Sequence, residues 1–115
     1  MEIVRRRREQ REAVIELARN WVSSLGFQVS AFLVGSYARG DFNLWSDVDI
    51  VLVSDVFGGT PVKRLENLDP PPGFQVIPLT VSEFKRLVEK QNPLATEALE
   101  HGVLLRDDYR IKGGV

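Results

Sequence analysis

Two aspartates, Asp47 and Asp49, flank Val48 at the beginning of an apolar run. In a β-strand, residues i and i+2 point to the same face, so we expect the two carboxylates to lie side by side. Like charges so close repel each other, and the repulsion is relieved when one carboxylate is protonated or when a cation binds both. Oxygen ligands suit a hard divalent ion, Mg²⁺ first and Mn²⁺ second. A simpler alternative is that Asp47 caps a turn and Asp49 faces solvent.

A glycine–serine pair, Gly35–Ser36, directly follows an earlier apolar run that ends at Val34. Glycine allows the backbone to come close to a ligand. Ser36 is expected to open a short helical turn whose free N–H groups favour phosphate oxygens, and its hydroxyl adds a further donor. Arg39 lies one helical turn further and could contact the same anion or a base. Taken alone, Gly35–Ser36 also fits an ordinary helix N-cap.

The combination of the two motifs is more informative than either alone. A phosphate-binding turn after one strand and a metal-binding carboxylate pair at the start of the next strand describe a site for a nucleoside triphosphate. In such a site the metal ion bridges the carboxylates and the phosphates, and it neutralises the charge that develops on the leaving pyrophosphate. The two motifs therefore predict metal-dependent nucleotide chemistry.

The order of these residues resembles the signature of the nucleotidyltransferase superfamily: Gly35–Ser36, then ten residues, then Asp47-x-Asp49. The stretch "GSYARGD" and the ending "NPLATEALEHGVLLRDD" are similar to the minimal nucleotidyltransferases within it. The resemblance extends from about residue 10 to about residue 108. It implies a polymerase-β-like fold, a short mixed sheet with helices on one side, and transfer of a nucleoside monophosphate, most often AMP from ATP, to a hydroxyl.

Carried over to this chain, the resemblance implies that Gly35 and Ser36 hold the triphosphate and that Asp47 and Asp49 bind Mg²⁺. Active members have a third carboxylate on the next strand, which here reads "GFQVIPLT" and offers Gln75 at the expected position. A glutamine amide can bind a metal weakly, but it cannot take a proton. The alternative function is therefore a catalytically impaired module that binds nucleotide or masks a partner.

The resemblance also implies a partner, because many minimal nucleotidyltransferases are encoded with a helical HEPN-domain protein. In some such pairs the small protein is an antitoxin that adenylylates its partner. Self-association is a further alternative. A third hypothesis, nucleic-acid binding, rests on the run Arg5–Arg8, which equally fits a solvated helix face with glutamate partners. The formal net charge of -1 argues against it.

The periodicity of the sequence predicts a small α/β or α+β fold, a mixed sheet with helices packed against it. Thr80 and Glu83 fit a capping box at the start of a helix. The predicted elements are a helix over 2–25, a strand over 27–34, a short turn over 38–42, a strand over 48–54, a short helix over 61–65, a strand over 74–79, helices over 81–89 and 93–102, and an edge strand over 103–105.

The composition bounds the other expectations. The chain has 115 residues, 43% of them hydrophobic and 27% charged, which suits a single globular domain over residues 1–115. The absence of cysteine excludes disulfides, thiolate metal sites and cysteine nucleophiles. No apolar run approaches the roughly 20 residues of a membrane span, so we expect a cytoplasmic protein. Trp45, just before the acidic pair, is expected to pack at the sheet edge or to flank a nucleotide base.

Overall fold

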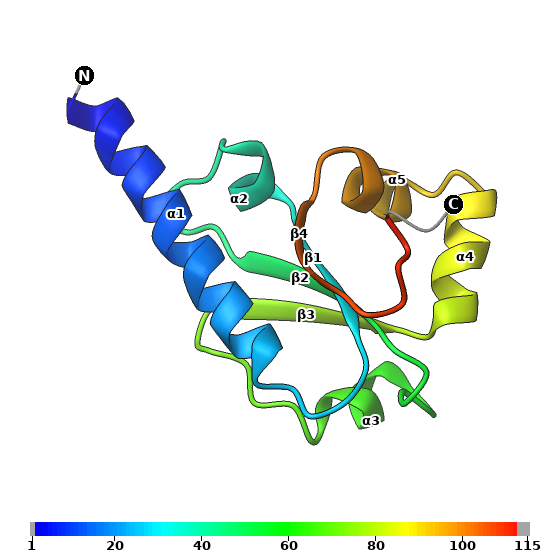
Figure 1. Cartoon of the computed structure of the whole chain (residues 1–115). Helices are drawn as coiled ribbons and strands as arrows, with labels where there is room; N and C mark the ends of the chain where they lie inside the picture. Colours follow the sequence, from blue (N-terminus) through cyan, green and yellow to red (C-terminus); the bar gives the residue numbers. More distant parts are fainter. Residues whose placement is uncertain (1, 113–115) are drawn as a thin grey trace.

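The computed structural model describes residues 2–112, which form one sheet with helices against it (Figure 1). Helices and strands follow each other in nearly the predicted order. In chain order the elements are α1 (Glu2–Ser23), β1 (Ser30–Val34), α2 (Ser36–Arg39), β2 (Val48–Val53), α3 (Pro61–Leu65), β3 (Phe74–Leu79), α4 (Val81–Glu89), α5 (Pro93–Glu100) and β4 (Val103–Asp107).

The four strands form a mixed sheet with the order β3-β2-β1-β4. Strand β1 is antiparallel to both β2 and β4, whereas β2 and β3 are parallel. The predicted mixed sheet and the predicted edge position of the last strand are both confirmed. The parallel pair is joined by residues 54–73, which include α3, and this long connection is what a parallel crossover requires.

Helices cover both faces of the sheet, so the expectation of helices on one side is wrong (Figure 1). Side chains alternate between the faces along a strand. On β1, Leu33 packs in the cluster that contains Val22 of α1, whereas Phe32 packs in the cluster that contains Phe84 of α4 and Ala98 of α5. The continuous apolar run of β2 has the same cause, because a strand covered on both faces needs apolar side chains in both directions.

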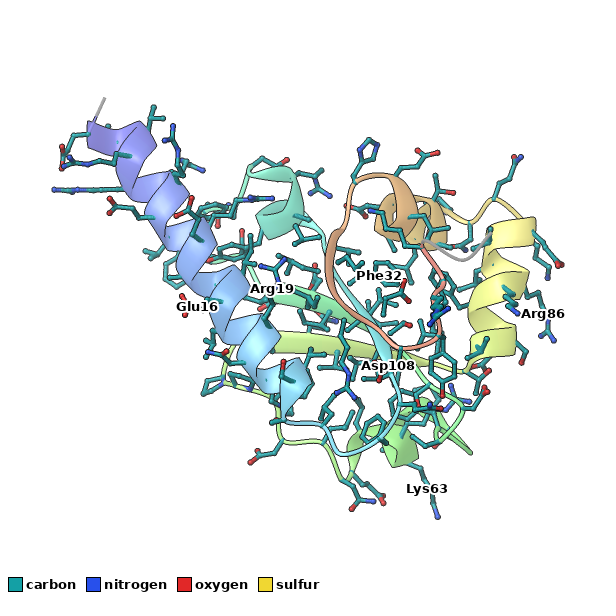
Figure 2. The ribbon with its side chains drawn as sticks, in the orientation of Figure 1. Glu16, Arg19, Phe32, Lys63, Arg86 and Asp108 are labelled. Carbon is teal, nitrogen blue, oxygen red and sulfur yellow. The ribbon has the colours of Figure 1, made fainter. Side chains whose placement is uncertain are left out.

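The packing on the α4 and α5 side is close. The rings of Phe32 and Phe84 are stacked with their centroids 5.9 Å apart, and Figure 2 shows Phe32 within the molecule, whereas Lys63 points outward. Gly102 follows α5, and a Cβ there would lie 3.1 Å from the Leu33 carbonyl oxygen and closer still to that of Ala98. Glycine at this position therefore lets α5 and β4 lie close to β1.

The first helix and first strand are both shorter than predicted. Helix α1 ends at Ser23 rather than at residue 25, and β1 begins at Ser30 rather than at residue 27. The guanidinium of Arg106 on β4 donates hydrogen bonds to the carbonyls of Val22, Leu25 and Phe27 at 2.9–3.0 Å. The side chain thus satisfies carbonyls between the end of α1 and the start of β1, where the backbone follows neither regular pattern.

Helix α1 is the longest helix, with 22 residues, and it carries many charged side chains. Within residues 2–112, no helix has both the length and the apolar character that crossing a membrane requires.

The predicted capping box at the start of α4 is confirmed, and a third residue completes it. The Thr80 hydroxyl accepts a hydrogen bond from the Glu83 amide, and the Glu83 carboxylate accepts one from the Thr80 amide. Arg64 of α3 donates to the same carboxylate at 2.6 Å. These hydrogen bonds, that of Arg64 above all, lower the pKa of Glu83 to about 2.

We expect the Glu83–Arg64 pair to make stability depend on pH in the acid range. Because the folded pKa of about 2 lies below the ordinary 4.5, the contribution is complete above pH 4.5 and is lost as the pH falls towards 2. The Glu83 side chain is 38% exposed, so solvent screening limits the effect to roughly 1 kcal/mol. Urea unfolding at about pH 7 and about pH 3 should show a smaller loss of stability in Glu83→Gln than in the wild type. Equal losses would contradict the assignment.

Candidate active site

The two motifs singled out in the sequence meet where β1 ends beside β2. Val34, the last residue of β1, pairs with Asp49 of β2. Gly35 has φ 78° and ψ −156°, a conformation that side-chain-bearing residues rarely adopt. A Cβ at this position would collide with the Asp49 carboxylate. The backbone of the glycine–serine turn therefore lies directly against one member of the acidic pair.

The turn after Gly35 is a single helical turn, α2, over Ser36–Arg39. It begins two residues earlier than the predicted range of 38–42 and ends at Gly40, whose φ of 93° reverses the chain direction. The first N–H groups of a helical turn have no acceptor within the turn. The amides that follow Gly35 are therefore suited to an anion, as the sequence predicts.

Two arginines of α1 bind backbone carbonyls of this turn and of the loop that follows it. Arg11 donates to the carbonyls of Tyr37 and Ala38 at 2.7 and 2.8 Å. Arg7 donates to the Phe42 carbonyl at 2.6 Å, and its guanidinium lies 5.3 Å from the centre of the Phe42 ring. The sequence analysis missed both roles, since nothing local links these arginines to carbonyls 26 and 35 residues away.

The Arg5–Arg8 run is thus divided in function. Arg5 donates to the Glu2 carboxylate at 2.8 Å, and Arg6 lies 3.6 Å from the same carboxylate, which fits the solvated helix face. Arg7, in contrast, bonds to the backbone of the loop after α2. Three of the four arginines of the run therefore have partners within the protein, and nucleic-acid binding by this run stays a prediction.

The acidic pair lies at the start of β2, and its two members differ in environment. Asp47 is exposed and precedes the strand by one residue, whereas Asp49 is half-buried within it. Burial raises the pKa of Asp49, the negative charges of Asp47 and Glu97 raise it further, and Arg39 opposes them. The Asp49 carboxylate therefore lies in a negative potential that a bound cation would relieve.

Gln75 is the β3 residue that pairs with Asp49 in the parallel register. It is therefore on the same face of the sheet, at the position where the sequence analysis expects the third carboxylate. The side chain is exposed. The amide brings no negative charge to the site and has no basic group that could accept a proton.

Glu97 of α5 is the site residue that the sequence analysis missed. One of its oxygens, Oε1, accepts a hydrogen bond from the Gly35 amide at 3.2 Å and another from Arg39 at 2.7 Å. Arg39 also donates to Asp41 at 3.3 Å. These hydrogen bonds raise the pKa of Arg39, which therefore remains charged. The sequence gives only a weak indication of this role of Glu97, because its partner Gly35 precedes it by 62 residues.

The aromatic residues near the site differ in burial: Tyr37 is packed, whereas Trp45 is exposed to solvent. Tyr37 is buried and stacks on Phe42 with the ring centres 4.3 Å apart, so its role is packing. Trp45 is 86% exposed, and its neighbour Leu44 is 84% exposed. The expectation that Trp45 packs at the sheet edge is therefore wrong, because residues 43–45 form a loop that projects from the fold. The alternative, that it flanks a base, remains a prediction.

The donor set fits a magnesium ion that shares its ligands with a substrate. Within residues 2–112, no three His, Cys, Asp or Glu side chains are grouped so that they could hold a metal by themselves. Mg²⁺ is commonly bound through one or two carboxylates together with substrate phosphates and water. Asp47 and Asp49 provide two such carboxylates beside the turn of Gly35 and Ser36.

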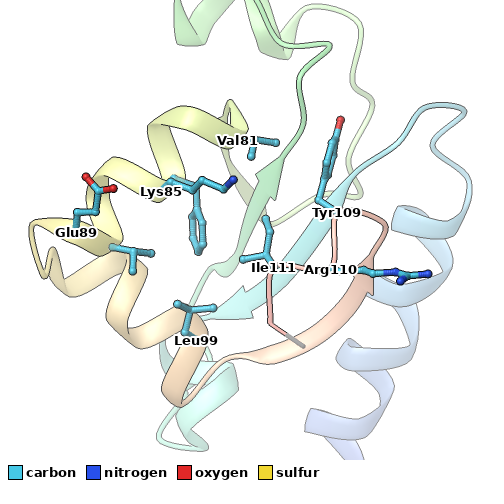
Figure 3. Close-up of a pocket in the computed structure, with 9 residues that line it drawn as sticks. Val81, Lys85, Glu89, Leu99, Tyr109, Arg110 and Ile111 are labelled. Atoms are coloured by element: carbon cyan, nitrogen blue, oxygen red, sulfur yellow. The ribbon is translucent and has the colours of Figure 1, made fainter. Parts of the chain in front are cut away.

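A hollow of about 490 Å³ lies elsewhere, between α4, α5 and residues 109–111 (Figure 3). Val81, Leu99 and Ile111 contribute apolar side chains to its wall, and Lys85 and Tyr109 contribute polar groups. None of its lining residues comes from the glycine–serine turn or from the acidic pair. The candidate active site is therefore separate from this hollow, at the end of β1 and the start of β2.

Replacing Gly35 should test the close approach to Asp49. We expect Gly35→Ala to destabilise the fold through backbone strain and through the collision with the Asp49 carboxylate. Gly40→Ala is the matched control, because Gly40 also has a positive φ but has open space around a Cβ. In urea unfolding, Gly35→Ala should cost roughly 1–3 kcal/mol more than Gly40→Ala. Equal costs would mean that the contact with Asp49 imposes no constraint.

Comparisons with known proteins agree with this geometry. The sequence matches the nucleotidyltransferase domain family over residues 8–105. A solved structure of a candidate nucleotidyltransferase from Sulfolobus solfataricus is similar with a TM-score of 0.61 and 23% identity, over 85% of this chain and 84% of that one, which shows a shared fold. A search of curated proteins returns no significant match. Because the family match spans most of the chain, the protein belongs to the nucleotidyltransferase domain family.

Proposed function

We propose that this protein transfers a nucleoside monophosphate, AMP from ATP, to a hydroxyl in a reaction that depends on Mg²⁺ or Mn²⁺. The observation that carries the proposal is the contact between the Gly35 backbone and the Asp49 carboxylate. It supports the assignment of a turn suited to phosphate and a pair of carboxylates suited to a metal ion to one site. Family membership supports nucleotidyl transfer as the reaction class.

The triphosphate would lie across the turn that begins at Gly35 and Ser36. The amides of the turn and the Ser36 hydroxyl can donate to phosphate oxygens, and Arg39 at the end of the turn adds a positive charge. Binding the phosphates here orients the α-phosphorus towards the acidic pair. The acceptor oxygen then forms a bond to the α-phosphorus while the bond to the leaving pyrophosphate breaks, and the hydroxyl proton passes to a base of the partner or to water, because Gln75 cannot accept it.

Asp47 and Asp49 would hold the divalent cation. Bound there, the ion supplies neutralisation of the negative charge that develops on the leaving pyrophosphate. Burial raises the pKa of Asp49 and the charges of Asp47 and Glu97 raise it further, and a bound cation would stabilise the ionised carboxylate against both effects.

The acceptor hydroxyl is proposed to come from a protein, and a HEPN-type helical protein is the partner that the family resemblance favours. A small domain offers little surface for recognising an acceptor. The loop at Leu44 and Trp45 presents two large apolar side chains just before the acidic pair. Exposed apolar groups of this kind commonly mark contact surfaces. In this pairing the chain would act as an antitoxin that adenylylates its partner.

Gln75 favours a second candidate function, a module that binds nucleotide or masks a partner without efficient catalysis. Its pairing with Asp49 puts an amide where the acceptor proton would otherwise meet a carboxylate. Binding of the triphosphate with its metal ion needs only the turn and the aspartate pair. Removal of the proton needs a base, and a side-chain amide cannot serve as one.

Calorimetric titration with ATP in the presence of Mg²⁺ tests the binding step. We expect Asp49→Asn to weaken binding at least about tenfold, because an anionic metal ligand is lost. Thermal unfolding should show no loss of stability, since Asn removes a half-buried charge whose pKa burial raises. Asp69→Asn, at an exposed aspartate outside the site, is the matched control. Unchanged affinity in Asp49→Asn would overturn the proposed site.

Mass measurement of a HEPN-type protein encoded beside this chain, incubated with the chain, ATP and Mg²⁺, tests the transfer step. The partner should gain the mass of one adenylyl group, and the gain should disappear with Asp47→Ala. Gln75→Asp should raise the rate about tenfold or more, because a base is restored beside Asp49. A stable complex with no mass gain, in the wild type and in Gln75→Asp alike, would favour the masking module.

A further inference from the structure

Glu97 joins the two ends of the α2 turn through a single oxygen. Its Oε1 accepts from the Gly35 amide at 3.2 Å, where the turn begins, and from Arg39 Nη1 at 2.7 Å, where the turn ends. We propose that Glu97 is a positioning residue that fixes the turn and Arg39 for binding the phosphates of the nucleotide. This inference rests on the proposed function, because it gives the turn a role in nucleotide binding.

The helix that carries Glu97 is itself firmly placed. Ala95 and Ala98 of α5 are fully buried against the sheet. A Cβ at Gly102, just after the helix, would collide with the Ala98 carbonyl of α5 and would lie 3.1 Å from the Leu33 carbonyl oxygen of β1, so the chain is closely packed at this end of the helix. The Glu97 side chain is only 26% exposed. A carboxylate on such a rigid support can hold the turn in one conformation, which reduces the ordering cost when a ligand binds.

The contacts of Arg39 leave one part of its guanidinium available. Nε donates to Asp41 and Nη1 donates to Glu97. Among the described residues, Nη2 has no hydrogen-bond partner. Two acids therefore fix the plane of the guanidinium, and its remaining N–H groups can donate to a phosphate oxygen. Without Glu97 the half-exposed Arg39 side chain would have more rotamers to lose on binding.

A role of Glu97 as the third metal ligand in place of Gln75 fits less well. The Oε1 oxygen already accepts two hydrogen bonds. Within the part of the chain that the structure describes, no three acidic or imidazole side chains are grouped to hold a metal ion. Glu97 acts on the site through Gly35 and Arg39 instead of through the ion.

Calorimetric titration of Mg·ATP into Glu97 variants is the first test. Glu97→Ala removes both hydrogen bonds and should weaken binding about tenfold, which corresponds to about 1.4 kcal/mol. Glu97→Gln keeps an oxygen for the Gly35 amide and should recover about half of that loss on a logarithmic scale. Glu100→Ala is the matched control on the same helix, because Glu100 is exposed and has only a 3.9 Å contact with His101. Glu97→Ala binding within twofold of the wild type would overturn the proposal.

A double-mutant cycle with Arg39 separates positioning from charge. The Glu97 carboxylate also repels incoming phosphates. In the absence of Arg39, removal of the Glu97 carboxylate should therefore leave the affinity for Mg·ATP unchanged or raise it. In the wild-type background, Glu97→Gln should lower the affinity for Mg·ATP; in Arg39→Ala it should not. Equal losses in both backgrounds would overturn the role through Arg39. This comparison uses the conservative variant, so it decides the question even where Glu97→Ala does not fold.

A readout without nucleotide separates this inference from the proposed function. The Gly35 amide donates to Glu97, so its hydrogen exchange, followed by NMR, should quicken at least about tenfold in Glu97→Ala relative to Glu100→Ala. Quicker exchange in a protein that never binds Mg·ATP would overturn the proposed function, but it would leave intact the role of Glu97 in fixing the turn. Unchanged exchange of the Gly35 amide in Glu97→Ala, with nucleotide binding preserved in the wild type, would overturn only the role of Glu97 in fixing the turn.

Discussion

The contact between the Gly35 backbone and the Asp49 carboxylate is the constraint on which the rest of the site depends. It requires a residue without a Cβ, a positive φ at that residue, and the antiparallel pairing of Val34 with Asp49. Each requirement is met by a different level of structure: residue type, backbone conformation and sheet register. Together they bring a turn suited to an anion and an acid suited to a cation into contact, although the two segments are separated in sequence.

The turn is held from both layers of the fold. From α1, Arg11 donates to carbonyls at the end of the turn, and Arg7 holds the loop that follows. From α5, on the opposite face of the sheet, Glu97 accepts the first amide of the turn and the guanidinium of Arg39. Helices on both faces therefore do more than cover the sheet. They hold one short backbone segment from two sides, through its carbonyls and through its first amide and Arg39.

Local features of this protein could be predicted from its sequence, whereas contacts between distant segments could not. The Gly35–Ser36 turn and the capping box at Thr80 follow from residue types within a few positions. The position of Gln75 beside Asp49 followed from the family resemblance, and the strand register agrees with it. Glu97 escaped prediction because its partner Gly35 lies 62 residues away and because glutamate on a helix is ordinarily a solvated residue. For the same reason, no local pattern reveals which arginine of α1 meets a carbonyl.

The amide at position 75 has opposite effects on the two steps of the proposed reaction. The pKa of Asp49 is already raised by burial and by the charges of Asp47 and Glu97. A further carboxylate paired with Asp49 would strengthen that repulsion and would also repel an incoming triphosphate. Gln75 avoids both penalties, so it favours binding of a polyanion, but it removes the base nearest to the acceptor. A site of this composition is therefore better suited to holding a nucleotide than to fast turnover, unless the acceptor hydroxyl is already acidic or the partner supplies the base.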